Sequence, residues 1–103
     1  MSEPRRGAVW WVDFGMAGKI RPAVVLSAPV SDTDYALFAT LPHTTSERSS
    51  QHHVRIRVAR LKDGAFDVQA LAPLAKFVPR ISTLSGAQLQ MLDVAVKRWL
   101  CLD

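Results

Sequence analysis

Two short apolar runs near the start of the chain, residues 8–14 and 23–26, dominate its hydrophobic pattern. Both are rich in Val and Trp and too short for helices of ordinary length, so they predict strands. The segment between them contains two glycines and ends in Pro22. Because proline restricts the preceding residue to extended conformations, the pattern predicts that Arg21 is held at the start of the second strand.

Two further strands are predicted in the middle of the chain. The first covers residues 35–40, and Pro42 is expected to end its regular pairing. The second covers residues 53–60, where apolar and polar side chains alternate most clearly. Because successive strand residues point to opposite faces, one face is predicted to be core and the other basic. The core face would hold Val54, Ile56 and Val58, and the basic face His53, Arg55 and Arg57.

The last third of the chain predicts a turn, broken strands and one helix. An Asp-Gly pair at residues 63–64 indicates the turn, and the apolar run over residues 66–74 indicates one bent strand or two short ones. Residues 76–78 continue this pattern up to Pro79. A capping box of Ser85 and Gln88 then starts a helix. Apolar residues recur along it at helical spacing, at Leu89, Leu92, Val96 and Trp99.

The pattern as a whole predicts a mainly β fold, a small barrel or strongly curved sheet with a C-terminal helix against it. At 103 residues the chain is expected to form a single domain over residues 1–103, with residues 1–5 frayed. It has 49% apolar and 21% charged residues, which is typical of globular proteins. Neither a membrane span nor a secretion signal is visible, so a cytoplasmic location is expected.

The charge of the chain permits a polyanionic partner. The net charge is +4, and nine of the thirteen basic residues are arginine. An arginine offers a planar fork of donors that matches phosphate oxygens, which makes Arg21 a candidate anion-binding residue. A solvated loop charge is the alternative for Arg21. For Arg55 and Arg57, contact with an RNA backbone and protection of a sheet edge remain equally open.

The chain resembles the MazF/PemK family of toxin endoribonucleases. Residues 6–27, RGAVWWVDFGMAGKIRPAVVLS, match an R-G-x-V-W-x-V-D strand, a variable loop and a G-K-x-R-P-A-V-V-x-S strand start. Residues 41–46, LPHTTS, resemble the P-x-T-[ST] turn after the third strand of that family. The resemblance implies an SH3-like barrel of the CcdB/MazF type with a C-terminal helix. It also implies a homodimer with single-stranded RNA in a basic groove along the dimer interface.

The resemblance also implies an activity and a partner. The family's arginine and threonine carry over to Arg21 and Thr44 as catalytic residues of a metal-independent, sequence-selective endoribonuclease. Its products would carry 2′,3′-cyclic phosphate and 5′-hydroxyl ends. The chain would be the toxin of a type II toxin–antitoxin pair, inhibiting translation and growth until a cognate antitoxin protein blocks the groove. Further candidates for acid–base or RNA-binding roles are His43, Thr45, Lys19, Arg55, Arg57 and Lys76.

Metal or cofactor chemistry is not expected from this sequence. Histidines stand at positions 43, 52 and 53, but no Cys or carboxylate lies at ligand spacing around them. His43 adjoins Thr44 and titrates near neutrality, so it is a candidate for proton transfer. If Thr44 faces the groove, however, a strand would turn its neighbour His43 to the other side.

The chain also departs from the family pattern. Many members carry a D-Q-x-R-T-x-D segment before the helix, whereas residues 74–79, LAKFVP, contain no acidic residue. Lys76 could serve there as a phosphate contact. Two alternative functions therefore stay open. One is a gyrase-poisoning toxin of the CcdB type, which would act through residues 99–103, and the other is a catalytically weakened module that binds RNA or an antitoxin.

Overall fold

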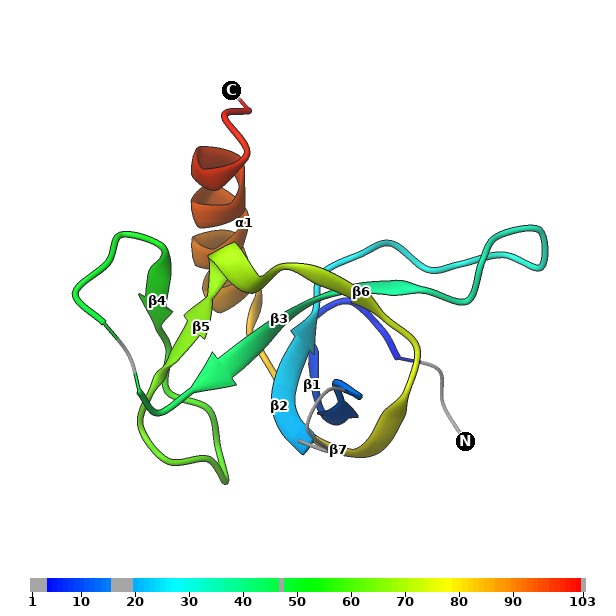
Figure 1. Cartoon of the computed structure of the whole chain (residues 1–103), viewed down its shortest axis with the longest axis horizontal. Coiled ribbons are helices and arrows are strands. Elements are labelled where there is room, and N and C mark those ends of the chain that lie inside the picture. Colours follow the sequence, from blue (N-terminus) through cyan, green and yellow to red (C-terminus); the bar gives the residue numbers. More distant parts are fainter. Residues whose placement is uncertain (1–3, 16–19, 47, 103) are drawn as a thin grey trace.

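The computed structural model describes residues 4–15, 20–46 and 48–102. Figure 1 shows an antiparallel sheet with one helix, α1, standing at one end. Hydrogen-bonded neighbours follow the order β4-β5-β3-β2-β1-β7, and β6 pairs separately with β3. The elements are β1 (Ala8–Asp13), β2 (Ile20–Val25), β3 (Phe38–Thr44), β4 (His53–Arg55), β5 (Ala65–Asp67), the 3₁₀ helix η2 (Val68–Ala70), β6 (Ala72–Leu74), β7 (Phe77–Thr83) and α1 (Gly86–Trp99).

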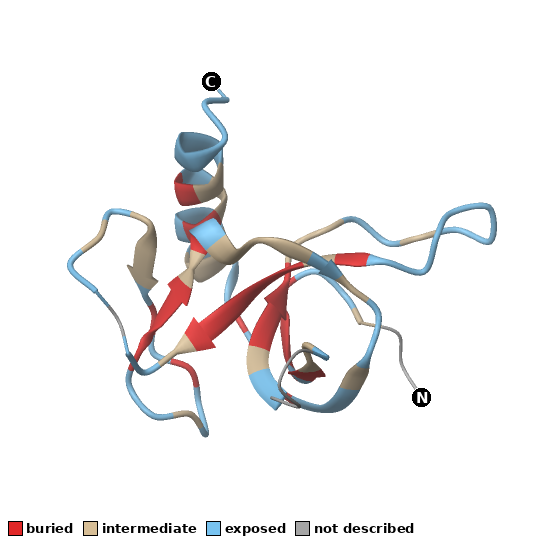
Figure 2. Ribbon diagram, viewed as in Figure 1, coloured by how far each residue is buried: buried red, intermediate tan, exposed pale blue. Residues whose placement is uncertain are grey.

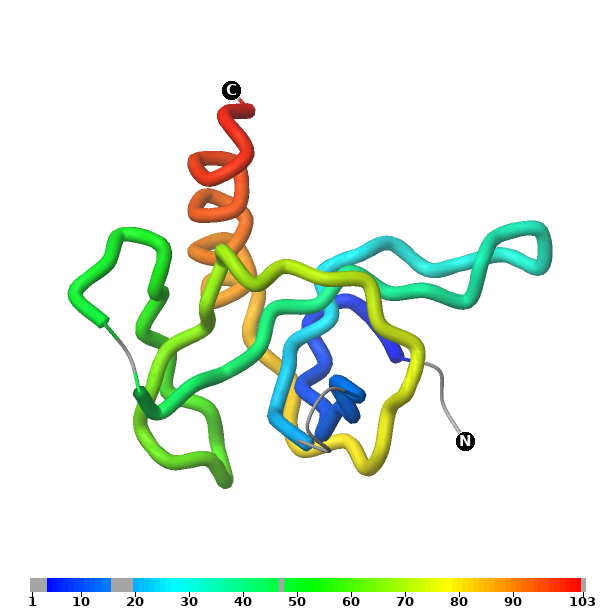
Figure 3. Tube along the Cα trace, in the orientation of Figure 1, coloured from blue at the N-terminus to red at the C-terminus, as the bar shows by residue number. Residues whose placement is uncertain are grey.

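Strand β3 connects the two halves of the sheet. One side of it pairs with β2, in the register Val24↔Leu41. Its other side pairs with β6 near its start and with β5 near its end. Figure 3 shows the chain beyond β6 curving round towards β7, which pairs with β1. The sheet is therefore strongly curved, as the sequence predicted.

Pro42 does not end β3, contrary to the sequence prediction. It lies inside the strand and pairs with Ala23 of β2. On the other side of β3, the ladder with β6 ends at Thr40 and the ladder with β5 begins at His43. Proline lacks a backbone N–H, so this gap between two ladders is a position where it loses little.

The predicted strand over residues 53–60 is shorter than expected. Only β4, His53–Arg55, pairs with β5. The alternation nevertheless predicted burial correctly where the strand is absent, since Ile56 and Val58 are buried and Arg57 is exposed. The backbone turns after Val58, where the N–H of Leu61 donates to the Val58 carbonyl oxygen at 3.1 Å.

The apolar run after the Asp-Gly turn forms two short strands, one of the two predicted outcomes. They are β5 and β6, separated by η2, whose N-cap Asp67 accepts a hydrogen bond from the Gln69 N–H. Strand β7 runs past Pro79 instead of ending there. Its register with β1 shifts between Trp10↔Arg80 and Val12↔Phe77, which marks a bulge. Bulges on edge strands accommodate proline, and this one contains Pro79.

Buried side chains form two clusters. Figure 2 colours the buried residues red, and most of them lie on the strands of the sheet. The larger cluster lies between the sheet and α1 and includes Leu41, Phe66 and Leu92, each 0% exposed. The smaller cluster includes Trp10 and Phe38, and the Phe77 ring meets both of their rings edge-on. Alternate residues of β1 supply the two clusters, Val9 the larger and Trp10 the smaller, as strand geometry requires.

The predicted capping box starts α1. The Ser85 hydroxyl accepts a hydrogen bond from the Gln88 N–H, and the Gln88 side chain accepts one from the Ser85 N–H. At the other end, the Leu102 N–H donates a hydrogen bond to the Lys97 carbonyl oxygen. Cys101, at φ +58°, occupies the left-handed position of the resulting Schellman motif.

Within the described residues, no helix has the length and apolarity to cross a membrane.

Replacing Leu92 by alanine is expected to lower the free energy of unfolding by about 2–5 kcal/mol, because the side chain is 0% exposed and its removal leaves a cavity. The neighbouring exposed Gln90→Ala is the control and should change stability little. Chemical denaturation followed by circular dichroism measures both. A Leu92→Ala protein as stable as the control would contradict the packing of α1 described here.

Candidate functional site

The start of β2 and the end of β3 meet at one edge of the sheet. Ala23 pairs with Pro42, so Arg21 precedes this pair by two residues and Thr44 follows it by two. Two residues are one period of a strand, which keeps Arg21 and Thr44 on the same face. On its other side β2 pairs with β1, where Val12 faces Arg21. The sheet itself therefore positions Arg21.

A cavity of about 590 Å³ opens at this edge. It brings together four of the eight site residues predicted from the sequence, namely Arg21, His43, Thr44 and Thr45. The described residues that line it are Trp11, Arg21, Pro22, His43, Thr44, Thr45, Ser46, Arg60, Leu61 and Lys62.

The cavity is basic. Arg21, Arg60 and Lys62 line it and are exposed, and the described lining residues include no aspartate or glutamate. Guanidinium groups bind phosphate oxygens with paired donors, and a cluster of like charges raises the local concentration of an anionic ligand. A ligand with phosphate groups therefore suits this site.

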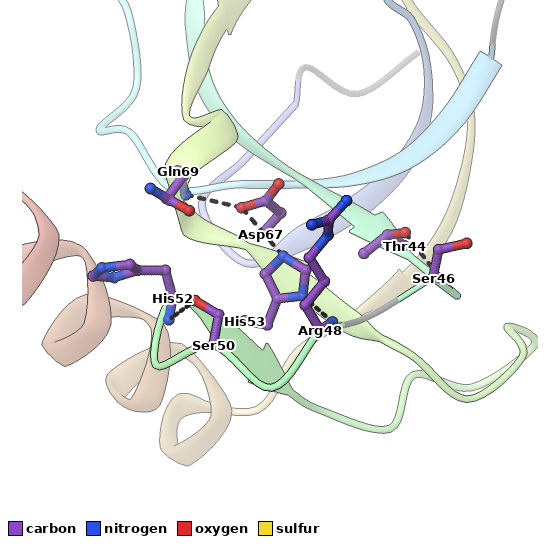
Figure 4. Close-up of polar contacts among 8 residues, drawn as sticks. All are labelled: Thr44, Ser46, Arg48, Ser50, His52, His53, Asp67 and Gln69. Atoms are coloured by element: carbon purple, nitrogen blue, oxygen red, sulfur yellow. Dashed lines mark hydrogen bonds and ion pairs between the residues drawn. The ribbon is translucent and has the colours of Figure 1, made fainter.

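Thr44 takes part in the turn that follows β3. Its hydroxyl oxygen accepts a hydrogen bond from the Ser46 N–H at 3.0 Å (Figure 4). This is the turn-stabilising role that threonine often has at such positions. The bond uses a lone pair, so the hydroxyl proton can still be donated to a ligand. A structural role and a ligand-binding role are thus compatible in the same side chain.

His43 is turned towards the core although it lines the same cavity. It is 5% exposed, and its ring meets the Phe66 ring edge-on with centroids 5.1 Å apart. Thr44 is half-buried. The sequence argument that neighbouring strand residues point to different sides is therefore reflected in the burial of the pair, but both residues reach the cavity.

At Gly64, the loop after β4 lies directly against the end of β3. A Cβ added to Gly64 would overlap the carbonyl oxygen of Thr44 and would lie 2.8 Å from Cε1 of His43. Only glycine permits so close an approach between the two backbones. The predicted Asp-Gly turn thereby fixes the loop that brings Arg60, Leu61 and Lys62 to the cavity.

Six of the described lining residues were not identified as site residues from the sequence, and three of these carry an aromatic ring or a positive charge. These three are Trp11, Arg60 and Lys62. A signal was present for Trp11, because two consecutive tryptophans in a strand must face opposite sides. Trp10 is 7% exposed and Trp11 is 38% exposed. Arg60 and Lys62 reach the site through a loop whose path the local pattern did not reveal.

Three predicted residues lie away from this cavity. Arg55 and Arg57 are exposed and border a separate hollow of about 260 Å³. Arg55 also borders a cavity between β4 and α1. Lys76 is exposed just before β7 and is not among the described lining residues of the Arg21 cavity. Lys19 lies outside the described residues, so its role stays a prediction.

Two histidines order the loop between β3 and β4 (Figure 4). Nδ1 of His53 accepts a hydrogen bond from the Arg48 N–H at 2.8 Å, and its Nε2 lies 3.7 Å from a carboxylate oxygen of Asp67. The Ser50 hydroxyl accepts from the His52 N–H at 3.0 Å. The loop that begins with Thr45 at the cavity is therefore tied back to the sheet.

Metal ligation has no evident position in the part of the chain that the structure describes. There, no three residues among His, Cys, Asp and Glu are grouped closely enough to hold an ion. His53 and Asp67 contact each other and the backbone of their own loops.

The fold resembles solved toxin structures. An endoribonuclease from a mycobacterial species, in complex with its cognate antitoxin, has a TM-score of 0.83 at 19% identity over 97% of each chain. The MazE–MazF complex from Deinococcus radiodurans has a TM-score of 0.82 at 18% identity over 100% of both chains. Mycobacterium tuberculosis toxin MazF-mt6 has a TM-score of 0.78 at 19% identity over 93% of this chain and 98% of that one.

These similarities confirm the predicted fold, a mainly β barrel of the CcdB/MazF type with a C-terminal helix. No curated protein matches the sequence significantly. A family model for the PemK-like, MazF-like toxin of type II toxin–antitoxin systems matches residues 5–100. The chain thus belongs to the PemK-like, MazF-like family of type II toxins.

Proposed function

We propose that this protein is an endoribonuclease toxin that cleaves single-stranded RNA in the Arg21 cavity without a metal ion. The observation that carries the proposal is that Arg21 and Thr44, from two different strands, line one basic cavity. Membership of the toxin family and the similarity to a mycobacterial endoribonuclease support it. Because Arg21 and Thr44 are both retained and both reach the cavity, a catalytic role is favoured over a binding module that has lost activity.

The proposed reaction is an attack by the ribose 2′-hydroxyl on the adjacent phosphorus. The 2′-oxygen forms a bond to phosphorus while the bond from phosphorus to the 5′-oxygen breaks. A base takes the proton of the 2′-hydroxyl, and an acid gives a proton to the departing 5′-oxygen. The products carry a 2′,3′-cyclic phosphate and a 5′-hydroxyl, so neither a water molecule nor an oxidant is consumed.

The lining residues suit the charges of this reaction. Negative charge builds on the non-bridging phosphoryl oxygens, and preorganised donors stabilise it. Arg21 supplies two parallel N–H donors, and the hydroxyl proton of Thr44 supplies another. His43 borders the cavity and is our candidate for one proton transfer. Thr45 also borders the cavity and is a candidate RNA contact.

The proposal extends to partners and to the effect on the cell. We expect a homodimer that acts on RNA in the cytoplasm, is selective for a short sequence, inhibits translation and growth, and is neutralised by a cognate antitoxin. Two of the similar structures contain an antitoxin bound to the toxin. On this chain, Met91 and Val94 of α1 are 50% and 51% exposed. These apolar side chains suit a protein interface.

Incubation of the purified protein with a long single-stranded RNA in EDTA tests the proposal. Discrete fragments are expected, and aligning their ends reveals the sequence preference. New 5′ ends should accept phosphate from polynucleotide kinase without prior phosphatase treatment, because they carry hydroxyl groups. Intact RNA, together with inhibition of gyrase supercoiling in a parallel assay, would instead favour action through residues 99–102, whose apolar side chains are exposed.

Trp11 is expected to contribute to RNA binding by stacking on a base. Its ring is 38% exposed and borders the cavity, and base–aromatic stacking contributes about 1–3 kcal/mol per base. Trp11→Ala should therefore lower kcat/KM by about tenfold to a hundredfold, and Trp11→Phe should retain most of the activity. Tyr35→Ala, in a loop where the ring is 86% exposed, is the matched control. Equal losses from Trp11→Phe and Trp11→Ala would argue against stacking.

A further inference from the structure

We propose that Arg60 is a second RNA-phosphate ligand of the Arg21 cavity, held in place by a turn that would ordinarily contain glycine. This inference rests on the proposed function, because it requires that RNA enters the cavity. Neither the sequence pattern nor the family resemblance singled out Arg60. Its position follows from the backbone of the loop between β4 and β5.

The turn around Arg60 has an unusual backbone. The Leu61 N–H donates to the Val58 carbonyl oxygen at 3.1 Å, which closes a four-residue turn with Arg60 in the third position. There Arg60 has φ +74°. Turns with a positive φ at the third position prefer glycine or asparagine, because a side chain with a Cβ is strained in the left-handed region.

The surroundings of the turn hold Arg60 in this conformation. Val58 is 4% exposed in the main core cluster, and Leu61 packs against the same cluster. A few residues later, Gly64 lies against the Thr44 carbonyl. Both ends of the loop are therefore anchored, and Arg60 cannot relax to a negative φ without displacing side chains that are packed in the core.

A comparison within the chain shows why Arg60 needs a separate explanation. Among the described residues, the other non-glycine residue with a positive φ is Cys101, at +58°. Cys101 occupies the left-handed position of a Schellman motif, which is a common way for a helix to end. Arg60 has no helix end to explain it. Strained residues of this kind cluster at ligand-binding sites.

The charge around Arg60 indicates the class of ligand. Arg60 shares the cavity with Arg21 and Lys62, and no carboxylate is found among the described lining residues. Arg21 and Arg60 come from opposite sides of the β3 end, one from β2 and the other from the loop that Gly64 holds. A chain of linked phosphates can use both arginines at once, so we assign Arg21 to the scissile phosphate and Arg60 to a neighbouring one.

Two substitutions separate this role from a structural one. Arg60→Gly removes the charge and suits the positive φ, so the protein should melt at the same temperature as the wild type or higher. Arg60→Lys keeps the charge. Lys97→Ala, at an exposed position in the last turn of α1, removes one charge elsewhere and is the matched control.

The measurement is the binding of a short, fluorescein-labelled 2′-O-methyl RNA of mixed sequence, followed by anisotropy at several salt concentrations. This RNA cannot be cleaved, so binding is measured independently of catalysis. Arg60→Gly should weaken binding and reduce the slope of log affinity against log salt by about 0.7, the value for one phosphate contact on a single strand. Arg60→Lys should retain most of the slope, and Lys97→Ala should change it least.

The outcomes distinguish this inference from the proposed function. An Arg60→Gly protein with the affinity, salt slope and cleavage rate of the wild type would overturn the role of Arg60 while leaving the nuclease intact. A wild-type protein that binds RNA with an Arg60-dependent slope but never cuts unmodified RNA would overturn the nuclease alone. A wild-type protein that binds no RNA would overturn both.

Discussion

An Arg21→Ala variant is expected to fold normally and to lose about a hundredfold to a thousandfold of the RNA cleavage rate. Arg21 is exposed at the edge of the sheet and lines the basic cavity with Thr44. Without Arg21, the negative charge that develops on the phosphoryl oxygens loses a preorganised hydrogen-bond donor. Exposed positions of this kind contribute about 0.5 kcal/mol or less to stability, so the melting temperature should scarcely change.

An Arg21→Lys variant separates the charge of Arg21 from the geometry of its guanidinium group. Lysine keeps the positive charge but loses the planar fork that binds two phosphate oxygens together. Arg21→Lys should therefore cleave faster than Arg21→Ala and more slowly than the wild type. Single-turnover cleavage of one RNA by the three proteins provides the rates. An Arg21→Ala protein that cleaves as fast as the wild type would remove Arg21 from the reaction.

A Gly64→Ala variant is expected to lose both stability and activity. The added Cβ would overlap the Thr44 carbonyl oxygen, and backbone atoms yield less readily than flexible side chains. Overpacking of this kind costs about 1–3 kcal/mol, which corresponds to a fall in melting temperature of about 5 °C or more for a chain of this size. The loop that carries Arg60 and Lys62 must move away from β3, so cleavage should also fall.

Gly86→Ala provides the matched control for this prediction. Gly86 is the first residue of α1, and a Cβ added there meets no atom within 4 Å. Alanine is the better helix former, so this variant should be as stable as the wild type or slightly more stable. Thermal melts and cleavage rates of both variants can be compared directly. Equal melting temperatures for Gly64→Ala and Gly86→Ala would contradict the close packing of the loop against Thr44.

The local signals in the sequence predicted several elements correctly. The strand β1 and the capped helix α1 were both expected, because Val–Trp runs and a Ser–Gln capping box act over a few residues. The prediction that two prolines would end strands was wrong. Pro42 and Pro79 both lie within strands, since one falls in a gap between two ladders and the other at a bulge on an edge strand. Both exceptions depend on pairing between distant segments, which a local pattern does not contain.

In the candidate site, too, some residues were predicted from the sequence and others depend on contacts between distant segments. The family resemblance pointed to Arg21 and Thr44, and the structure brings them to one cavity because β2 and β3 are adjacent and antiparallel. Arg60 was expected only as the last residue of a strand over residues 53–60. It reaches the cavity instead, because β4 ends at Arg55 and the chain turns after Val58. That path is set by core packing and by the contact of Gly64 with β3, both of which are tertiary.

The measurement that tests the central claim most directly is cleavage, in EDTA, of a synthetic RNA that spans a mapped cut. Its matched copy carries a single 2′-deoxynucleotide immediately 5′ of that cut. If the Arg21 cavity directs the 2′-hydroxyl to the phosphorus without a metal, the RNA should be cut and the deoxy copy should stay intact at that position. Cleavage of the deoxy copy at the same bond, or loss of all cleavage in EDTA, would contradict this account.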